Sequence, residues 1–306
     1  MTATPQMMRI MALSINTAAR AGTIIRDVMQ RGNLGIVEKE GKDDLQTEAD
    51  RSAQQCIIAS LSRKFPNVRV IGEEGDSNLD VKAEWLVTEE NNDFLTNCCP
   101  QEWLEVKEEE FVVWVDPLDG TSEYTQGLLE HVTVLIGVAV KGRAVGGVIY
   151  QPYYKQSNGD LGRTIWGLIG LGTGGFEPKT PPKGQMIVTT TRSHSTPLVQ
   201  QALDALSPTE VIKVGGAGYK VIQLLEGKAH AYIFASPGCK RWDTCAPEAV
   251  LEAYGGTLTD LAGVHYSYSS DVEYKNRMGV LATIPGLSHA DLAAKVPYKI
   301  IETLKS

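Results

Sequence analysis

The chain has 306 residues, 42% of them hydrophobic and 22% charged, with a formal net charge of −8, so it can form a large core in one or two domains of an ordinary soluble protein. Its five cysteines form neither a CxxC pair nor a Cys/His cluster, which argues against a structural zinc site or a disulfide framework and favours a reducing compartment. No apolar run approaches the length of a membrane span, and basic residues are scattered rather than arranged in a stripe, so we expect neither a membrane nor a nucleic acid as partner.

The first predicted element is a helix from Met7 to Arg31, where apolar residues recur at helical spacing. The same stretch holds four arginines and Asp27 as its only acid, a composition that some organellar transit peptides share. That alternative stays open, but a first helix packed on the body of the protein is our expectation. Because no secretory signal is recognisable, we expect a cytoplasmic location.

A second helix is predicted between Asp50 and Pro66, after an extended piece at 34–40 and a polar stretch at 42–50. Asp50 is either an ordinary helix residue or the cap of this helix. The strand predicted at 68–71 ends in Glu73 and Glu74, so an apolar strand delivers acids at its end.

Residues 73–110 form an acidic segment, with thirteen acidic residues against two lysines, a local charge of −11. A solvated excursion is the ordinary interpretation of such a segment. The alternative is a lid or rim that gathers cations beside a metal site.

The most informative motif is DPLDGT at 116–121, which directly follows the apolar strand 111–115. Pro117 favours extended geometry at Asp116, and Gly120 permits a reversal, so we predict a tight turn that brings Asp119 alongside Asp116. These carboxylates and the Leu118 carbonyl are hard oxygen ligands suited to Mg²⁺, and the amides after Asp119 could receive phosphate oxygens.

The pattern of predicted strands and helices in the rest of the sequence divides the chain into two domains. Glycine-punctuated strands at 131–140, 144–150 and 164–171 indicate an antiparallel sheet. The proline-rich stretch 178–184 is the best linker, so we predict an α+β domain at 1–183 with most metal ligands and an α/β domain at 184–306 with Asp243 and the substrate contacts. The second domain alternates strand and helix at 186–190, 197–206, 211–214, 219–226, 230–235 and 244–254.

Three loops of the second half carry candidate site residues. Thr191 and His194 lie in a hydroxyl-rich loop between a strand and a helix, where capping is the alternative to ligand contact. Gly216 and Lys220 lie in a glycine-rich turn before a helix, which lets a ligand approach the helix N-terminus but lacks the dinucleotide-binding spacing. Asp243 is expected to be the N-cap of the last helix, with Pro247 in its first turn.

Taken together, these segments resemble the magnesium-dependent, lithium-inhibited phosphatases of the inositol monophosphatase superfamily, in an order and spacing that cover nearly the whole chain. The resemblance rests on Asp44–Asp50 (DLQTEAD), Gly72–Glu74, Asp116–Thr121, and Trp242–Asp243 with Gly255–Gly256. Glu123-Tyr124, Gly127, Val214–Lys220 and Thr189–Ser195 look most like the members that remove the 3′-phosphate of adenosine 3′,5′-bisphosphate. Inositol monophosphatases tend to carry asparagine and phenylalanine after the motif's threonine, where this chain has Ser122, Glu123 and Tyr124.

The resemblance implies a layered α/β/α/β/α sandwich of the α/β class, with the site between two domains. It implies two to three Mg²⁺ ions, inhibition by Li⁺, and a water polarised by Asp50 and Thr121. The implied metal ligands are Glu73, Asp116, the Leu118 carbonyl, Asp119 and Asp243, and the implied substrate contacts are Thr121, Thr191, His194, Gly216, Lys220 and Asp243.

The sequence therefore predicts a magnesium-dependent phosphomonoesterase whose substrate is a small phosphorylated nucleotide, and we expect a monomer. An inositol phosphatase, acting on inositol 1,4-bisphosphate or inositol monophosphate, is the alternative within the class. A non-catalytic metal or nucleotide sensor is the alternative from another class.

Overall fold

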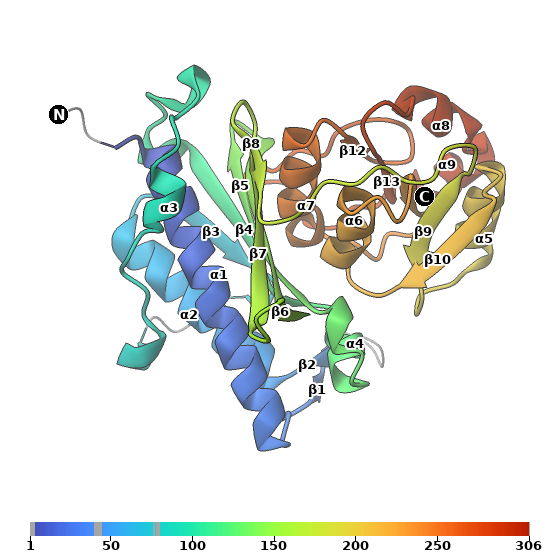
Figure 1. Cartoon of the computed structure of the whole chain (residues 1–306). Coiled ribbons are helices and arrows are strands. Elements are labelled where there is room, and N and C mark those ends of the chain that lie inside the picture. The colour runs from blue at the N-terminus through green and yellow to red at the C-terminus, as the bar shows by residue number, and fades with distance from the viewer. Residues whose placement is uncertain (1–3, 40–44, 76, 78–79, 306) are drawn as a thin grey trace.

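The computed structural model describes residues 4–39, 45–75, 77 and 80–305, and its helices and sheets form alternating layers (Figure 1). Two sheets of six and five strands alternate with three layers of helices. The predicted α/β/α/β/α sandwich is confirmed. Each sheet is covered by helices on both faces, as apolar strands require.

The larger sheet consists, in order across it, of β3 (Arg69–Gly72), β4 (Phe111–Asp119), β5 (Thr133–Val140), β6 (Arg143–Lys155), β7 (Leu161–Leu168) and β8 (Gly172–Gly174). β3 and β4 run parallel, and every other neighbouring pair is antiparallel. The antiparallel pairing predicted for the glycine-punctuated strands is therefore confirmed. The parallel pair matters most for the site, because it places the ends of β3 and β4 at one edge.

Two long helices, α1 (Gln6–Arg31) and α2 (Glu48–Lys64), cover the outer face of this sheet (Figure 1). The predicted first helix is confirmed, and its apolar face is buried against the sheet while Gly32 ends it at φ 74°. Between the two helices, β1 (Val37–Glu38) pairs with β2 (Leu45–Gln46). Residues 40–44, which include the end of the predicted extended piece and Asp44 of the polar stretch, lie outside the described residues.

The middle layer contains α6 (Ala217–Leu225) and α7 (Arg241–Ala253), which lie between the two sheets (Figure 1). The backbone of α7 rests directly on three glycines of the larger sheet. A Cβ atom would lie 2.6 Å from Ala246 N at Gly137, 2.4 Å from Ala246 O at Gly147 and 2.7 Å from Val250 Cα at Gly167. Glycine is needed at these positions because the approach is too close for any side chain.

The smaller sheet has the order β10 (Glu210–Val214), β9 (Ile187–Thr191), β11 (Ala231–Phe234), β13 (Val280–Thr283) and β12 (Thr257–Thr259). β9, β10 and β11 are parallel, as the predicted strand and helix alternation requires, whereas β12 and β13 are antiparallel and were not predicted. Helices α5 (Pro197–Ala205), α8 (His289–Lys295) and α9 (Tyr298–Lys305) lie on the outer side (Figure 1).

The acidic segment runs between β3 and β4 over the same face as α1. Its short helices, η1 (Ala83–Trp85), α3 (Asn92–Leu95), η2 (Gln101–Trp103) and η3 (Glu108–Glu110), are anchored by the buried side chains of Phe94 and Trp103. Asp76 lies outside the described residues. Past Glu73, no residue of this segment lines the candidate pocket among the described residues, which favours the solvated excursion over a lid.

Two short helices, α4 (Thr121–Thr125) and η4 (Leu129–His131), connect β4 to β5. The predicted linker at 178–184 lies between β8 and β9, and the domain boundary at 183/184 stays a prediction. Within the described residues, every helix is too short or too polar to span a bilayer.

Candidate active site

The site begins where β3 and β4 end. In their parallel register Gly72 lies opposite Val115, so the next residues, Glu73 and Asp116, emerge side by side, and the Glu73 N–H donates to the Val115 carbonyl at 3.1 Å. The carboxyl ends of parallel strands meet at one edge of a sheet. The sequence predicted that both strands end in acidic residues, and the parallel pairing of β3 and β4 brings two of these carboxylates together.

The DPLDGT motif is a bulged strand end, and the predicted tight turn is wrong. β4 continues to Asp119, with Asp116 opposite Leu135 and Asp119 opposite Thr133, so three residues of β4 advance against two of β5. The bulge forms because the Asp116 side chain accepts the Leu118 N–H at 3.0 Å. The reversal follows at Gly120, whose φ of 92° suits glycine, and α4 begins there.

Asp243 reaches the same place from α7, but it is not the N-cap. Lys240 caps α7, and Asp243, three residues later, accepts the Lys240 N–H through Oδ2 at 2.7 Å. Pro247 accordingly lies inside the helix rather than in its first turn. This reciprocal bond fixes one oxygen of Asp243 and leaves the other for a ligand.

The oxygens of Glu73, Asp116 and Asp243 lie within 4.8 Å of one another. Burial, followed by the charges of Glu73 and Asp119, raises the pKa of Asp243 from 3.8 to about 7. Burial and the charges of Glu73, Asp119 and Asp243 also raise the pKa of Asp116. Three carboxylates this close repel each other strongly, and a bound divalent cation is the usual remedy.

Lys39 partly compensates this charge from the hairpin side. Its Nζ lies 3.0 Å from Glu73 Oε1 and 3.1 Å from Glu74 Oε1. No sequence pattern pointed to Lys39, because it lies in the predicted extended piece at 34–40, 34 residues from Glu73.

A second group of possible ligands consists of Glu248 and Glu252, further along α7, and His265, in the loop after β12. The charged and polar side chains of this group already pair with one another and with a neighbouring tyrosine. The His265 ring lies 3.0 Å from Glu248 and 3.3 Å from Glu252, and the Tyr268 hydroxyl donates to Glu248. The group at Glu73 lacks such a central donor among its own members, which makes it the stronger candidate for a metal.

Asp119 joins the two halves of the molecule. Its Oδ1 accepts the Ala217 N–H at 2.8 Å, and its Oδ2 accepts the Gly218 N–H at 2.8 Å and the Thr133 hydroxyl at 2.6 Å. The sequence predicted that a ligand could approach the N-terminus of this helix, but the first amides of α6 are bonded by a carboxylate of the protein itself. Asp119 retains a lone pair on Oδ1, and its charge acts on Asp116 and Asp243.

Asp50 and Thr121 form the predicted pair. The Thr121 hydroxyl lies 3.0 Å from Asp50 Oδ1 and 3.1 Å from the Leu118 carbonyl, so it donates to one of them at a time. Asp50 is the third residue of α2, and its other oxygen accepts from Thr47, the N-cap. Burial, partly offset by the Thr47 hydrogen bonds, raises the pKa of Asp50 from 3.8 to about 7.

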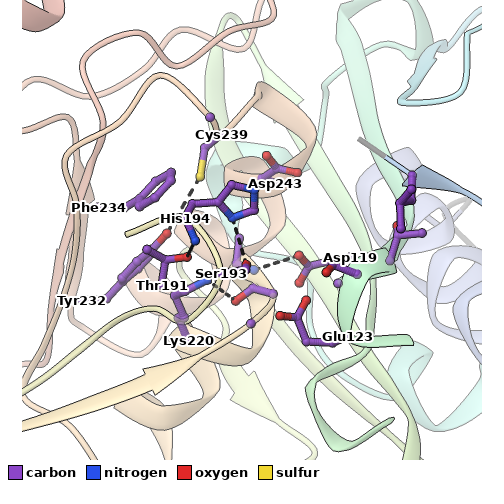
Figure 2. A pocket seen from close by; sticks show the side chains of 18 of the residues that line it. Asp119, Glu123, Thr191, Ser193, His194, Lys220, Tyr232, Phe234, Cys239 and Asp243 are labelled. Atoms are coloured by element: carbon purple, nitrogen blue, oxygen red, sulfur yellow. Dashed lines mark hydrogen bonds between the residues drawn. The ribbon is translucent and has the colours of Figure 1, made fainter. Parts of the chain in front are cut away.

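Most of these groups line one pocket with a volume of about 170 Å³ (Figure 2). Its wall includes eight of the predicted site residues, namely Glu73, Asp119, Thr121, Thr191, His194, Gly216, Lys220 and Asp243. Asp50, Asp116 and Leu118 are not among the residues that line it.

The second-half residues of the wall bond one another. Lys220 is buried and its Nζ donates to the Gly216 carbonyl at 3.0 Å, while Thr191 Oγ1 accepts the His194 N–H at 3.1 Å. The N-cap of α5 is Thr196, so capping does not account for Thr191 and His194.

The wall also includes Tyr232, Phe234 and Cys239, which sequence reasoning missed (Figure 2). A signal was present. β9, β10 and β11 are parallel, so the loops after Thr191, Val214 and Phe234 meet at one edge, where α/β sheets bind their ligands. The strand at 230–235 was predicted, but its place beside β9 was not.

Comparison with known proteins agrees with this geometry. The model of the inositol monophosphatase family matches residues 6–299. The chain is 52% identical over 301 residues to human 3′(2′),5′-bisphosphate nucleotidase 1, covering 97% of each chain. It is 38% identical to the protein of that name from Dictyostelium discoideum, covering 93% of this chain and 95% of the relative.

Among solved structures, the extragenic suppressor protein suhB of Bartonella henselae superposes with a TM-score of 0.67 at 20% identity, covering 94% of this chain and 98% of that one. A likeness at this identity shows the fold. Together with the family match, it leads to one conclusion: the chain belongs to the inositol monophosphatase family.

Proposed function

We propose that this protein is a magnesium-dependent phosphomonoesterase that hydrolyses the 3′-phosphate of adenosine 3′,5′-bisphosphate to AMP and phosphate. The observation that carries the proposal is the convergence of Glu73, Asp116 and Asp243 from β3, β4 and α7 within 4.8 Å. The names of the human and Dictyostelium relatives support the substrate.

The donor set fits Mg²⁺. All candidate ligands are oxygens, and neither sulfur nor imidazole belongs to the group at Glu73. Glu73, Asp116 and Asp243 would hold the cation, with Asp119 and the Leu118 carbonyl beside them. When bound, Mg²⁺ neutralises the phosphoryl group, acidifies water and stabilises the leaving oxygen.

The chain's own contribution to the reaction is the handling of the water proton. The Thr121 hydroxyl, when it donates to Asp50 Oδ1, presents its lone pairs to a water and aligns it. Asp50, with a pKa of about 7, takes a proton at neutral pH as a general base. Because Thr47 holds its second oxygen, Asp50 keeps Oδ1 directed at Thr121.

The second half of the chain supplies the substrate contacts in this proposal. Lys220 is the one lysine or arginine among the described residues that line the pocket, so it provides the fixed positive charge for a phosphate. Thr191 and His194, at the end of β9 and in the loop after it, also line the pocket. The pocket is open to solvent, which suits a nucleotide larger than a phosphate ion.

The proposal is tested by phosphate release from adenosine 3′,5′-bisphosphate, inositol 1,4-bisphosphate and inositol 1-phosphate, with and without Mg²⁺. We expect turnover of the nucleotide that requires Mg²⁺ and that Li⁺ inhibits. A clear preference for the inositol phosphates overturns the nucleotide assignment. Binding of the nucleotide without turnover favours the sensor.

A matched pair of variants assigns the activity to the site. Asp116→Asn keeps an acceptor for the Leu118 N–H but removes the charge, and we expect it to abolish turnover. Asp260→Asn is the control, because Asp260 is a buried aspartate outside the pocket wall whose side chain accepts the Ala262 and Val264 amides of its own loop. Equal losses in both variants would contradict the assignment.

We also propose that the enzyme acts in the cytoplasm. All five cysteines, including the adjacent Cys98 and Cys99, are free. Free thiols on the surface are typical of a reducing compartment.

A further inference from the structure

Glu123 is a buried carboxylate of the pocket wall that no metal or water chemistry requires. It lies in the first turn of α4, two residues after Thr121, and is only 3% exposed. Figure 2 shows it below Asp119 at the pocket. Its Oε1 is buried and has no hydrogen-bond partner among the described residues.

The nearest cation does not satisfy this oxygen. Arg192 Nε lies 3.7 Å away, which is an ion-pair distance but too long for a hydrogen bond. The Arg192 guanidinium instead donates to Gln126 Oε1 at the rim. A buried acceptor without a donor costs free energy, and a ligand bound in this pocket could supply the donor.

The chain leaves room for the carboxylate at this place. A Cβ atom on Gly215 would lie 2.0 Å from Glu123 Cδ and 2.2 Å from Oε1, and one on Gly120 would lie 3.7 Å from Oε2. The carboxylate thus lies between the backbones of two pocket-wall loops, one from each half of the chain. Its position is fixed by backbone and not by a flexible neighbour.

The chemistry of the missing donor can be stated. A carboxylate repels phosphate, so the ligand group must be a hydroxyl or an amine. Glu123 follows Thr121 by two residues, and Thr121 lies beside the expected position of the scissile phosphate. The donor is therefore a group bonded close to that phosphate, which in a nucleoside 3′-phosphate is the neighbouring 2′-hydroxyl rather than the distant base.

We propose that Glu123 is a specificity-determining residue whose carboxylate accepts a hydrogen bond from the sugar hydroxyl next to the scissile phosphate, so that the enzyme selects ribonucleotide over deoxyribonucleotide bisphosphates. This inference rests on the proposed function. A site built to bond a hydroxyl rejects the analogue that lacks it, because its acceptor is left unpaired.

The test compares kcat/KM for adenosine 3′,5′-bisphosphate and its 2′-deoxy analogue. The unmodified enzyme is expected to prefer the ribose compound by roughly 10- to 100-fold, the range for a hydrogen bond to a charged group. Glu123→Ala should lower this ratio to near 1, mainly through loss on the ribose compound, while Glu123→Gln, which keeps one acceptor, should retain a preference of several-fold.

Arg192→Ala is the matched control. If Glu123 contacts the substrate, the ratio survives in Arg192→Ala; if Glu123 serves only to hold Arg192, the ratio collapses there and the inference is overturned. Equal turnover of both compounds by the unmodified enzyme also overturns it, while leaving the proposed function intact. No turnover of either compound overturns the proposed function and the inference together.

Discussion

Replacing Asp243 by asparagine is expected to stabilise the protein when no metal is present. The amide oxygen of the new side chain would still accept the Lys240 N–H, so α7 would retain its reciprocal cap. What is lost is a partly buried charge beside Glu73 and Asp116. A pKa of about 7 in place of 3.8 corresponds to about 4 kcal/mol against the ionised form. Because the neighbouring carboxyls share this repulsion, we expect a gain of about 2–4 kcal/mol at pH 8, or roughly 5 °C in Tm.

The sign of the pH dependence follows from the raised pKa. Between pH 3.8 and about 7 the folded protein holds a proton on Asp243 that the unfolded chain has released, so stability falls as pH rises through this range. The advantage of Asp243→Asn should therefore be full above pH 7, shrink below it and vanish near pH 4.

Thermal unfolding followed by circular dichroism in EDTA, at pH 8 and pH 5, measures this advantage, with Asp260→Asn as the control that gains nothing. Excess Mg²⁺ should then raise the Tm of the unmodified protein at pH 8 and have little effect on Asp243→Asn, because a ligand of the folded state stabilises it. The reasoning is refuted if Asp243→Asn is no more stable than the unmodified protein at pH 8 in EDTA, or if its gain is as large at pH 5.

Three further outcomes are expected. Thr121→Ala should lower kcat about 10²-fold with KM little changed, because the hydroxyl that joins Asp50 to the water is gone, whereas Thr121→Ser should keep most activity in steady-state kinetics; equal losses would contradict this role. Gly147→Ala should destabilise the protein by about 1–3 kcal/mol in urea unfolding, since its Cβ would lie 2.4 Å from Ala246 O, and an unchanged midpoint would show that α7 can move away. His289 lies between the Thr259 and Thr283 hydroxyls, and burial lowers its pKa from 6.5 to about 4, so the unfolded chain binds the extra proton and stability should fall by about 1–2 kcal/mol, after allowance for partial exposure, as pH falls from 6.5 to 4. His289→Gln should flatten this acid limb of a Tm-against-pH curve, and an equally steep limb in the variant would assign it to other groups.

The carboxylates of the first half were predictable because they follow apolar strands directly. The end of a strand is a local feature, and the runs before Glu73 and Asp116 identify it. That the two strands are parallel neighbours is not local, yet it follows once both acids are required at one edge.

Other features depend on individual hydrogen bonds, between distant segments or within a few residues, that no sequence pattern shows. Asp119 accepts the first amides of α6, about 100 residues away. The N-cap of α7 is Lys240, which acts through its backbone amide, so its side chain gives no capping signal in the sequence. The bulge after Asp116 arises from a side-chain bond to Leu118 that competes with the ladder, so the turn residues of the motif were misleading.

The three glycines under α7 have a consequence for how such enzymes diversify. Asp243 projects from the first turn of a helix whose backbone rests on Gly137, Gly147 and Gly167, all in the larger sheet. Its place relative to Asp116 is thus set by the larger sheet of the first half, and not by the smaller sheet of the second half to which α7 is joined in the chain. A change in the loops or outer helices of the second half therefore leaves the spacing between Asp243 and Asp116 in place, as long as α7 keeps its seat on these glycines.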